Sequence, residues 1–183
     1  MNPMDIIEKY YDTDSKAYEI LVQHALCVTK KALEIAESVP ELNPDLRFIE
    51  EAAMLHDIGI IRTHVPELGC FGKEPYAKHG IIGREMLEKE GLPKHALICE
   101  RHTGVGITKE DIEKQGLPLP ARDMIPLTLE EEIIALADNF YSKSGEDLTK
   151  EKQLSTIRRG LSEYGQEKVV KFDAGCKKFG ITI

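Results

Sequence analysis

The sequence has no apolar run that approaches the roughly 18 residues a membrane-spanning helix needs. Its N-terminus, Met1–Asp5, also lacks the basic region and following apolar region of a signal peptide. These two absences argue against a membrane protein and against a secreted one. We therefore expect a cytoplasmic protein that makes no contact with a membrane.

Paired cysteines are also missing. The four cysteines are scattered along the chain: Cys27, Cys70, Cys99 and Cys176. Because none forms a C-x-x-C pair, neither a zinc knuckle nor a dithiol redox motif is indicated. Cys99 lies three residues before His102, but it ends the apolar run Ala96–Cys99 and is expected to be a small core residue.

The chain has no excess of positive charge. Its 24 Lys and Arg residues face 32 Asp and Glu residues, which gives a formal net charge of −8. Such a charge argues against non-specific binding to a nucleic-acid backbone. An acidic protein that handles phosphate groups usually does so through a local site that contains metal, not through a basic surface.

No convincing β-strand is present, and apolar residues recur at helical spacing almost throughout. With 183 residues, 42% of them apolar, the chain can bury a core as one domain. Neither a repeat nor a linker divides it, so we predict a single all-α domain over residues 1–183, a helical bundle. Helices are expected at about 17–38, 43–57, 76–90, 93–102, 128–138, 150–162 and 165–178, with a short one opened by a capping pair of Thr108 and Asp111.

Several boundaries carry their own signals. Asn43 and Pro44 suit an N-cap and a first helical turn, and Gly59 suits a left-handed C-terminal cap. Residues 60–75 are expected to form a loop that directly follows His56 and Asp57 and serves as a lid or as an edge of the substrate site. The last residues, Gly180–Ile183, offer at most weak strand pairing.

Four histidines and two aspartates stand out along the helical pattern. They are His24, His56, Asp57, His79, His102 and Asp138. Taken singly, a histidine on a helix face is more often a hydrogen-bonded core residue than a ligand. Asp138 is more informative, because burying its charge at the end of the apolar run Ile133–Asp138 costs several kcal/mol unless a cation or strong donors compensate it. A shared metal centre would explain all six residues together, and a mixed N/O ligand set suits Zn, Mn, Fe, Co or Ni.

Three phrases of the sequence strengthen this interpretation. Ala53–Gly59 contains the letters HDIG, Lys78–Gly80 reads KHG, and Ile134–Asn139 reads IALADN. From about residue 20 to residue 140 the chain resembles the HD superfamily of metal-dependent phosphohydrolases. The segment Arg101–Thr108 resembles a small stand-alone HDIG group. The final 40 or so residues, with the predicted helices that pack on this core, contribute no motif.

The resemblance implies a ligand set for two metal ions. In the family the first His, the HD pair and the last Asp hold one ion, which here implies His24, His56, Asp57 and Asp138. Members with two further histidines hold a second ion, with the HD aspartate as a bridge. Those histidines correspond here to His79 and His102.

Two departures from family patterns limit the choice of reaction. No second histidine and no GYP signature follow His102, which disfavours cyclic-di-GMP phosphodiesterases. Ile60 stands where HD 5′-nucleotidases have a catalytic glutamate. Besides Asp57, the predicted catalytic residues are therefore His64, Lys78 and Arg101, or a metal-bound water. Arg62 is a further candidate for a phosphate clamp, and Phe71 and Tyr76 are candidates for stacking on a base.

The sequence thus predicts a metal-dependent phosphohydrolase that uses metal-activated water on a phosphorylated small molecule, with a nucleotide as the favoured substrate. One or two divalent ions (Fe, Mn, Co, Ni or Zn) are the expected cofactors, and a homodimer is possible. Two alternatives stay open. One is a di-iron oxygenase built on the same ligands. The other is a non-catalytic module that binds metal or nucleotide.

Overall fold

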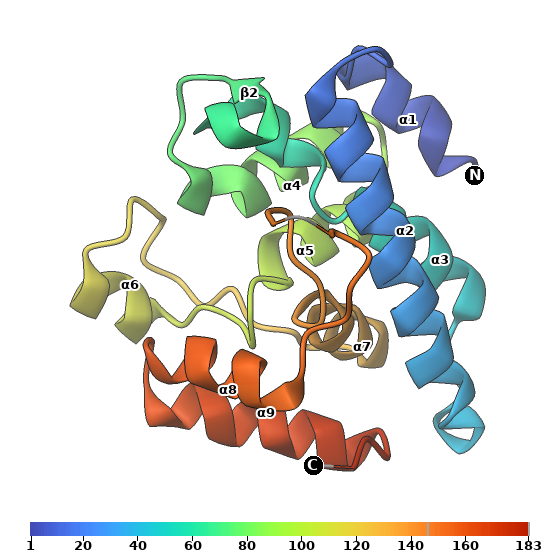
Figure 1. The fold of residues 1–183 in the computed structure, drawn as a ribbon, viewed down its shortest axis with the longest axis vertical. Coiled ribbons are helices and arrows are strands. Elements are labelled where there is room, and N and C mark those ends of the chain that lie inside the picture. The colour runs from blue at the N-terminus through green and yellow to red at the C-terminus, as the bar shows by residue number, and fades with distance from the viewer. Residues whose placement is uncertain (146, 183) are drawn as a thin grey trace.

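The computed structural model describes residues 1–145 and 147–182, and it is a single helical domain (Figure 1). The α-helices are α1 (Pro3–Tyr10), α2 (Lys16–Glu37), α3 (Leu46–Leu55), α4 (His79–Lys89), α5 (Pro93–Arg101), α6 (Lys109–Gln115), α7 (Leu129–Asp138), α8 (Leu154–Ser162) and α9 (Gln166–Lys178). Shorter elements are the 3-10 turns η1 (Pro40–Leu42), η2 (Ile58–Arg62), η3 (Pro66–Leu68) and η4 (Tyr76–Lys78), and the strands β1 (His64–Val65) and β2 (Cys70–Phe71). The predicted all-α fold is confirmed.

The long helix α2 packs against both α3 and α7. Ser15 caps its start by accepting a hydrogen bond from the Tyr18 amide. Helix α1 was not among the expected elements, although its signals are present. Asn2 caps it by accepting from the Met4 amide at 3.2 Å, and Pro3 occupies its first turn.

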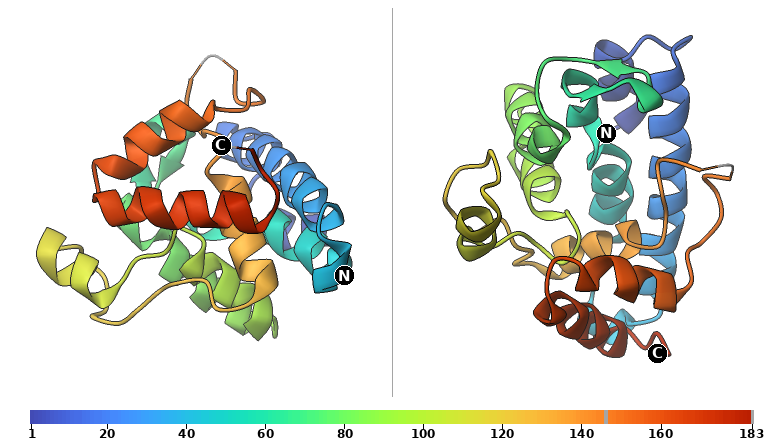
Figure 2. Two further views of the ribbon diagram at one scale, coloured as in Figure 1. Left: turned by 90° about the horizontal axis from the view of Figure 1, so that it is seen from below. Right: turned by 60° about the vertical axis from the view of Figure 1, so that its left-hand side comes forward.

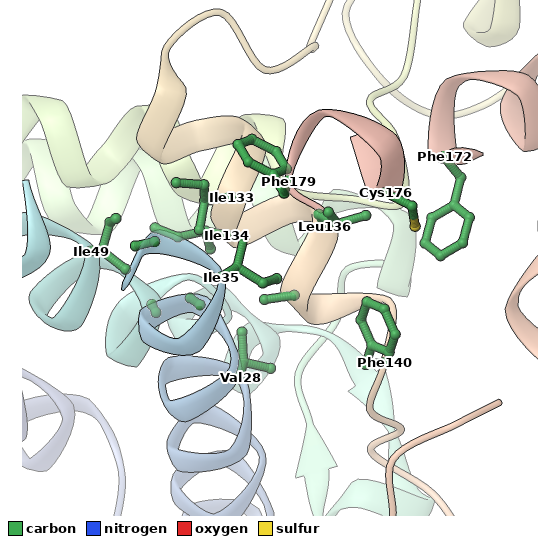
Figure 3. Packing of buried hydrophobic residues seen from close by; sticks show 14 of the residues in the cluster. Val28, Ile35, Ile49, Ile133, Ile134, Leu136, Phe140, Phe172, Cys176 and Phe179 are labelled. Carbon is green, nitrogen blue, oxygen red and sulfur yellow. The ribbon is translucent and has the colours of Figure 1, made fainter. Parts of the chain in front are cut away.

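Two apolar clusters fill the interior. Figure 3 shows the first, which includes Val28 and Ile35 of α2, Ile133 of α7 and the fully buried Phe172 of α9. The second cluster joins α1, α2, α3, η2 and α4. On α2, His24 lies between Leu21 of the second cluster and Val28 of the first. His24, one of the predicted metal ligands, therefore lies where the two apolar clusters meet.

Helices α8 and α9 lie side by side and cover one end of the bundle (Figure 2). Helix α6 and its flanking loops project from the body. The capping pair predicted for α6 is confirmed, because Thr108 and Asp111 accept reciprocally from each other's backbone amides. No helix in residues 1–145 or 147–182 combines the length and apolar character that a membrane crossing requires.

The segment between α3 and α4 contains more structure than the expected loop. Strands β1 and β2 pair antiparallel, with His64 opposite Phe71 and Val65 opposite Cys70. The Tyr11 hydroxyl donates to the Ile58 carbonyl at 2.9 Å and accepts from the Ile61 amide at 3.1 Å. These bonds anchor the beginning of the segment to the residue that directly follows α1.

Two predicted boundaries are wrong. Helix α3 is capped by Asp45, which accepts from the Phe48 amide at 2.9 Å, and not by Asn43, which instead has φ of 53° at the end of η1. Gly59 lies inside η2 without a left-handed φ. A Cβ on Gly59 would stand 2.1 Å from the His79 carbonyl oxygen. This glycine is therefore required by close packing on α4, not by backbone conformation. Residues 180–182 form no strand, and Ile183 lies outside the described residues.

Candidate metal centre

The structure brings the six predicted ligand residues together from five elements. His24 lies in the middle of α2, His56 and Asp57 directly follow α3, His79 begins α4, His102 directly follows α5, and Asp138 ends α7. Five of them are at most 3% exposed, and the Asp138 side chain is 14% exposed. The local cause is that α3, α5 and α7 all end at this point. A helix C-terminus carries partial negative charge, so three of them favour a cation there.

The first group consists of His24, His56, Asp57 and Asp138. The Asp57 Oδ2 atom lies 3.3 Å from His24 Nε2 and 3.1 Å from His56 Nε2. The Asp138 Oδ1 atom lies 2.9 Å and 3.4 Å from the same two nitrogens. Two ligands that are each about 2.1 Å from one ion lie roughly 3.0–3.4 Å apart in octahedral or tetrahedral geometry. The four contacts have nearly these lengths.

The second group consists of Asp57, His79 and His102. The other carboxylate oxygen, Asp57 Oδ1, lies 3.4 Å from both His79 Nε2 and His102 Nε2. The two Nε2 atoms are 3.2 Å apart. Asp57 thus presents one oxygen to each group, which is the arrangement of a carboxylate that bridges two ions.

Three of the imidazoles are held by their other nitrogen. His56 Nδ1 donates to the Ala53 carbonyl at 2.6 Å, His79 Nδ1 to the Tyr76 carbonyl at 2.8 Å, and His102 Nδ1 to the Cys99 carbonyl at 2.9 Å. Because a carbonyl only accepts, Nδ1 carries the proton in each ring. The Nε2 atoms are then directed into the cluster, as in protein metal sites.

Unpaired polar atoms give an independent test of whether a cation fits here. Within the described residues, His56 Nε2 and Asp57 Oδ1 are buried without a hydrogen-bond partner. Buried polar groups in native proteins are rarely left unpaired. A divalent ion in each group would satisfy these atoms, and imidazole with carboxylate is a donor set for Mn, Fe, Co, Ni or Zn.

The electrostatics of the centre also demand positive charge. Burial by itself raises the pKa of the Asp57 carboxyl, but Lys143 and His56 hold that pKa well below its usual range. Burial lowers the pKa of His56, yet the Asp57 and Asp138 carboxylates raise it to about 10. Burial dominates at His79 and lowers its pKa to about 4, which leaves this ring neutral. Two buried carboxylates therefore remain ionised and attract cations.

One cation at the site was not anticipated from the sequence. The Lys143 Nζ atom lies 2.7 Å from Asp57 Oδ2 and 3.7 Å from Asp138 Oδ1, and the lysine side chain is only 15% exposed. Although burial opposes it, the two carboxylates raise the pKa of Lys143 well above its ordinary value. The only sequence signal was its position five residues after Asp138, within the polar segment Ser142–Gly145.

The predicted proton-transfer and clamp residues lie farther out. His64 and Arg62 are exposed, Lys78 pairs with Glu74 at 2.7 Å, and Arg101 donates to Glu131 at 2.8 Å. Within the described parts of the chain, the side chains of these four residues form no hydrogen bond or ion pair with the six ligand residues. Their catalytic roles stay predictions.

Two other residues have roles that the structure defines more closely. The Tyr76 ring stacks on His79, with centroids 4.6 Å apart and planes 23° from parallel, whereas Phe71 is 75% exposed. Cys99 is fully buried, and its thiol donates to the Leu55 carbonyl at 3.3 Å, so the prediction that it is a core residue is confirmed.

Two cavities adjoin the centre. A cleft of about 530 Å³ is bounded by Asp138 and Lys143 on one side of the cluster. A mostly apolar cavity of about 300 Å³ is bounded by His79 and Leu117 together with residues of α6, α8 and α9, among them Leu161. Tyr76 borders both cavities. Their sizes are at the scale of small-molecule sites, which run from about 300 to 1,000 Å³.

Comparison with known proteins identifies the sequence family. The sequence profile of the HD domain matches residues 21–142. An uncharacterized protein of Methanocaldococcus jannaschii, MJ0778, is 41% identical over 125 residues, which are 67% of this chain and 66% of that protein. The match ends near Lys143, so the last two helices fall outside the profile.

Two further relatives are longer proteins. The tRNA (cytidine(56)-2'-O)-methyltransferase of Picrophilus torridus is 37% identical over 69% of this chain, and that of Thermoplasma volcanium is 33% identical over 76%. The matched part is about one third of each methyltransferase (33% and 35%). Among solved structures, the HD domain of the L. monocytogenes phosphodiesterase PgpH has the same fold. The TM-score is 0.54 at 15% identity, with 98% of both chains covered.

Proposed function

Because the chain belongs to the HD domain family, we propose that its histidine and aspartate cluster is the active site of a metal-dependent phosphohydrolase that holds two divalent ions. The observation that carries this proposal is the division of Asp57 between two ligand groups. Its Oδ2 faces His24 and His56, and its Oδ1 faces His79 and His102, with all these contacts between 3.1 and 3.4 Å. A binuclear site needs one bridging carboxylate, and this aspartate has the required surroundings.

In the proposed centre His24, His56, Asp57 and Asp138 hold the first ion, and Asp57, His79 and His102 hold the second. When bound, such ions lower the pKa of a coordinated water toward neutrality and neutralise phosphate oxygens. The carbonyls that accept from Nδ1 of His56, His79 and His102 keep these rings in one orientation. Preorganised ligands avoid a reorganisation cost during the reaction.

The reaction is hydrolysis of a phosphoester. Water supplies its oxygen to phosphorus, the P–O bond to the organic group breaks, and the leaving oxygen takes up a proton. For that proton we retain the candidates His64, Lys78 and Arg101. Lys78 directly precedes His79, and Arg101 directly precedes His102, so both begin close to the second group.

We further propose that the substrate is a nucleotide. Two observations support this choice. The cleft next to Asp138 and Lys143 offers a cationic side chain for phosphate, and the apolar cavity next to His79 offers space for an uncharged ring. The relatives named as tRNA methyltransferases act on a nucleic acid by their printed names. Since only about one third of each is matched, methyl transfer is not part of the proposal.

Metal analysis of the purified protein tests the binuclear centre. We expect about two ions per chain for protein made without a His-tag, and one or fewer for His79→Ala. The matched control is His95→Ala, because His95 is also a buried histidine of this fold but contacts Glu51 outside the cluster. A single ion that His79→Ala leaves in place would contradict the second site.

Activity is tested with a phosphoester panel. Nucleoside monophosphates, cyclic dinucleotides and dinucleoside polyphosphates should be compared with a simple aryl phosphate, each with Mn, Fe, Co or Ni. Asp57→Ala should abolish turnover. Oxygen uptake that depends on a substrate would instead favour the di-iron oxygenase. Ligand binding without turnover of any compound would favour the non-catalytic module.

A further inference from the structure

The segment that joins α7 to α8 is orange in Figure 1. It contains Lys143, whose positive charge lies beside the six ligand residues. It carries Lys143 to within 2.7 Å of Asp57 Oδ2, the oxygen that faces His24 and His56. The lysine lies just beyond residue 142, where the HD domain match ends.

Lys143 also borders the cleft beside Asp138. The other polar lining residues of that cleft include Asn139, Ser144 and Lys152. Lys152 is half-buried, and its backbone amide donates to the Phe140 carbonyl at 2.7 Å, which ties the end of the segment to the end of α7. Two lysines thus face one opening that leads to the ionised carboxylates of the centre.

A purely structural role would be to neutralise those carboxylates. That role does not require Lys143 to line an open cleft of about 530 Å³, nor a second lysine in the same opening. An ammonium group donates up to three hydrogen bonds, so Lys143 can contact Asp57 and still direct an N–H toward a ligand in the cleft. Lysine is a common phosphate ligand in proteins because it acts as a compact positive charge.

We propose that Lys143 is a phosphate-binding residue of this site, with Lys152 as a second and weaker contact in the same cleft. The proposal rests on the proposed phosphohydrolase function and adds to it the residues that recognise the phosphate group. The ligand class is a phosphate oxyanion, either free or esterified. Hydrogen bonds that involve a charged group are stronger than those between neutral groups. Replacement of Lys143 should therefore mainly weaken the binding of phosphate.

The test is binding of inorganic phosphate to the metal-loaded protein, measured by calorimetry, with metal content determined on the same samples. Lys143→Met should bind phosphate about ten- to a hundred-fold more weakly at unchanged metal content. Lys152→Met should lose a few-fold. The matched control is Lys150→Met, because Lys150 is an exposed lysine of the same segment.

Unchanged phosphate affinity in Lys143→Met, or loss of metal from Lys143→Met, would overturn the proposal. Metal-loaded wild type that binds no phosphate would instead contradict the phosphohydrolase function itself.

Discussion

His79 and His102 face each other with their Nε2 atoms 3.2 Å apart, and each ring donates its Nδ1 proton to a backbone carbonyl. Two lone pairs at this distance repel each other unless a cation lies between them. The two histidines are distant in the sequence, since His79 begins α4 and His102 directly follows α5. The packing of α4 on α5 creates the pair.

The first prediction concerns the tautomers of the three anchored histidines. In zinc-loaded protein, nitrogen-15 NMR should find the proton of His56, His79 and His102 on Nδ1, because each Nδ1 has a carbonyl acceptor. His64, which is exposed, serves as the internal reference. An Nε2–H tautomer in any of the three rings would contradict the assigned ligand atoms.

The second prediction concerns removal of metal. Chelation should destabilise the protein, because a ligand at a hundred times its Kd contributes about 2.7 kcal/mol to the free energy of unfolding. For a chain of this size that corresponds to roughly 5–10 °C in Tm, measured by calorimetry with and without chelator. The Tm of Asp57→Ala should depend little on chelator, since both ligand groups lose their shared residue. An equal chelator effect in Asp57→Ala would place the stabilising metal elsewhere.

The third prediction concerns Gly59. A Cβ there would meet the His79 carbonyl oxygen at 2.1 Å and the Gly83 amide nitrogen at 2.4 Å, both of them backbone atoms. Gly59→Ala should therefore push η2 away from α4 and destabilise the fold by about 1–3 kcal/mol or more. It should also weaken binding of the second metal, because His79 moves with α4.

Gly160→Ala is the matched control for that substitution. Gly160 lies in α8, and a Cβ at this position would have nothing within 4 Å. Alanine should stabilise this helix by about 0.5–1 kcal/mol. Chemical denaturation measures the free energy of unfolding of both variants. An unchanged free energy of unfolding in Gly59→Ala would contradict the close packing of η2 on α4.

The fourth prediction concerns a nearly buried ion pair, in which Lys168 of α9 contacts Asp111 of α6 and donates to the Gly106 carbonyl at 3.0 Å. The two side chains are 7% and 12% exposed. Lys168→Met should cost about 3–5 kcal/mol near neutral pH, because it leaves the Asp111 charge without its partner. The double variant Lys168→Met with Asp111→Asn should recover part of this loss in denaturation experiments.

The same pair sets a dependence on pH. Burial raises the pKa of the Asp111 carboxyl, but Lys168 and Thr108 bring it below its ordinary value in the folded protein. A lowered folded-state pKa contributes stability above the unfolded value of about 3.9, and that contribution is lost as the pH falls through the folded-state value. The difference between wild type and Lys168→Met should thus be full at pH 6–7 and shrink below about pH 4. A difference that is constant down to pH 3 would contradict an electrostatic origin.

The helical fold was predictable because its helices carry strong local signals. Apolar spacing located α2 and α7 to within one or two residues, and Thr108 with Asp111 identified the start of α6. Weaker signals failed. The caps at Asn2 and Asp45 were not recognised, because short polar residues before a helix are common and compete with one another as caps.

The glycine of the HDIG letters shows a different kind of failure. A glycine that follows a helix most often indicates a left-handed cap, and the sequence favoured that interpretation for Gly59. The actual requirement is the approach of η2 to the backbone of α4, at residues twenty and twenty-four positions further along the chain. No local pattern reports a long-range contact of this kind.

The sequence by itself determined the helices other than α1, the six residues of the cluster and their membership in one family, because each of these depends on residue type and spacing. Tertiary structure alone decided that the two oxygens of Asp57 divide between two ligand groups, and that Lys143 reaches the same carboxylate from a polar segment. The physical reason is that both facts are distances between elements far apart in the chain. They follow from how α2, α4, α5 and α7 pack around η2, and packing depends on the whole core at once.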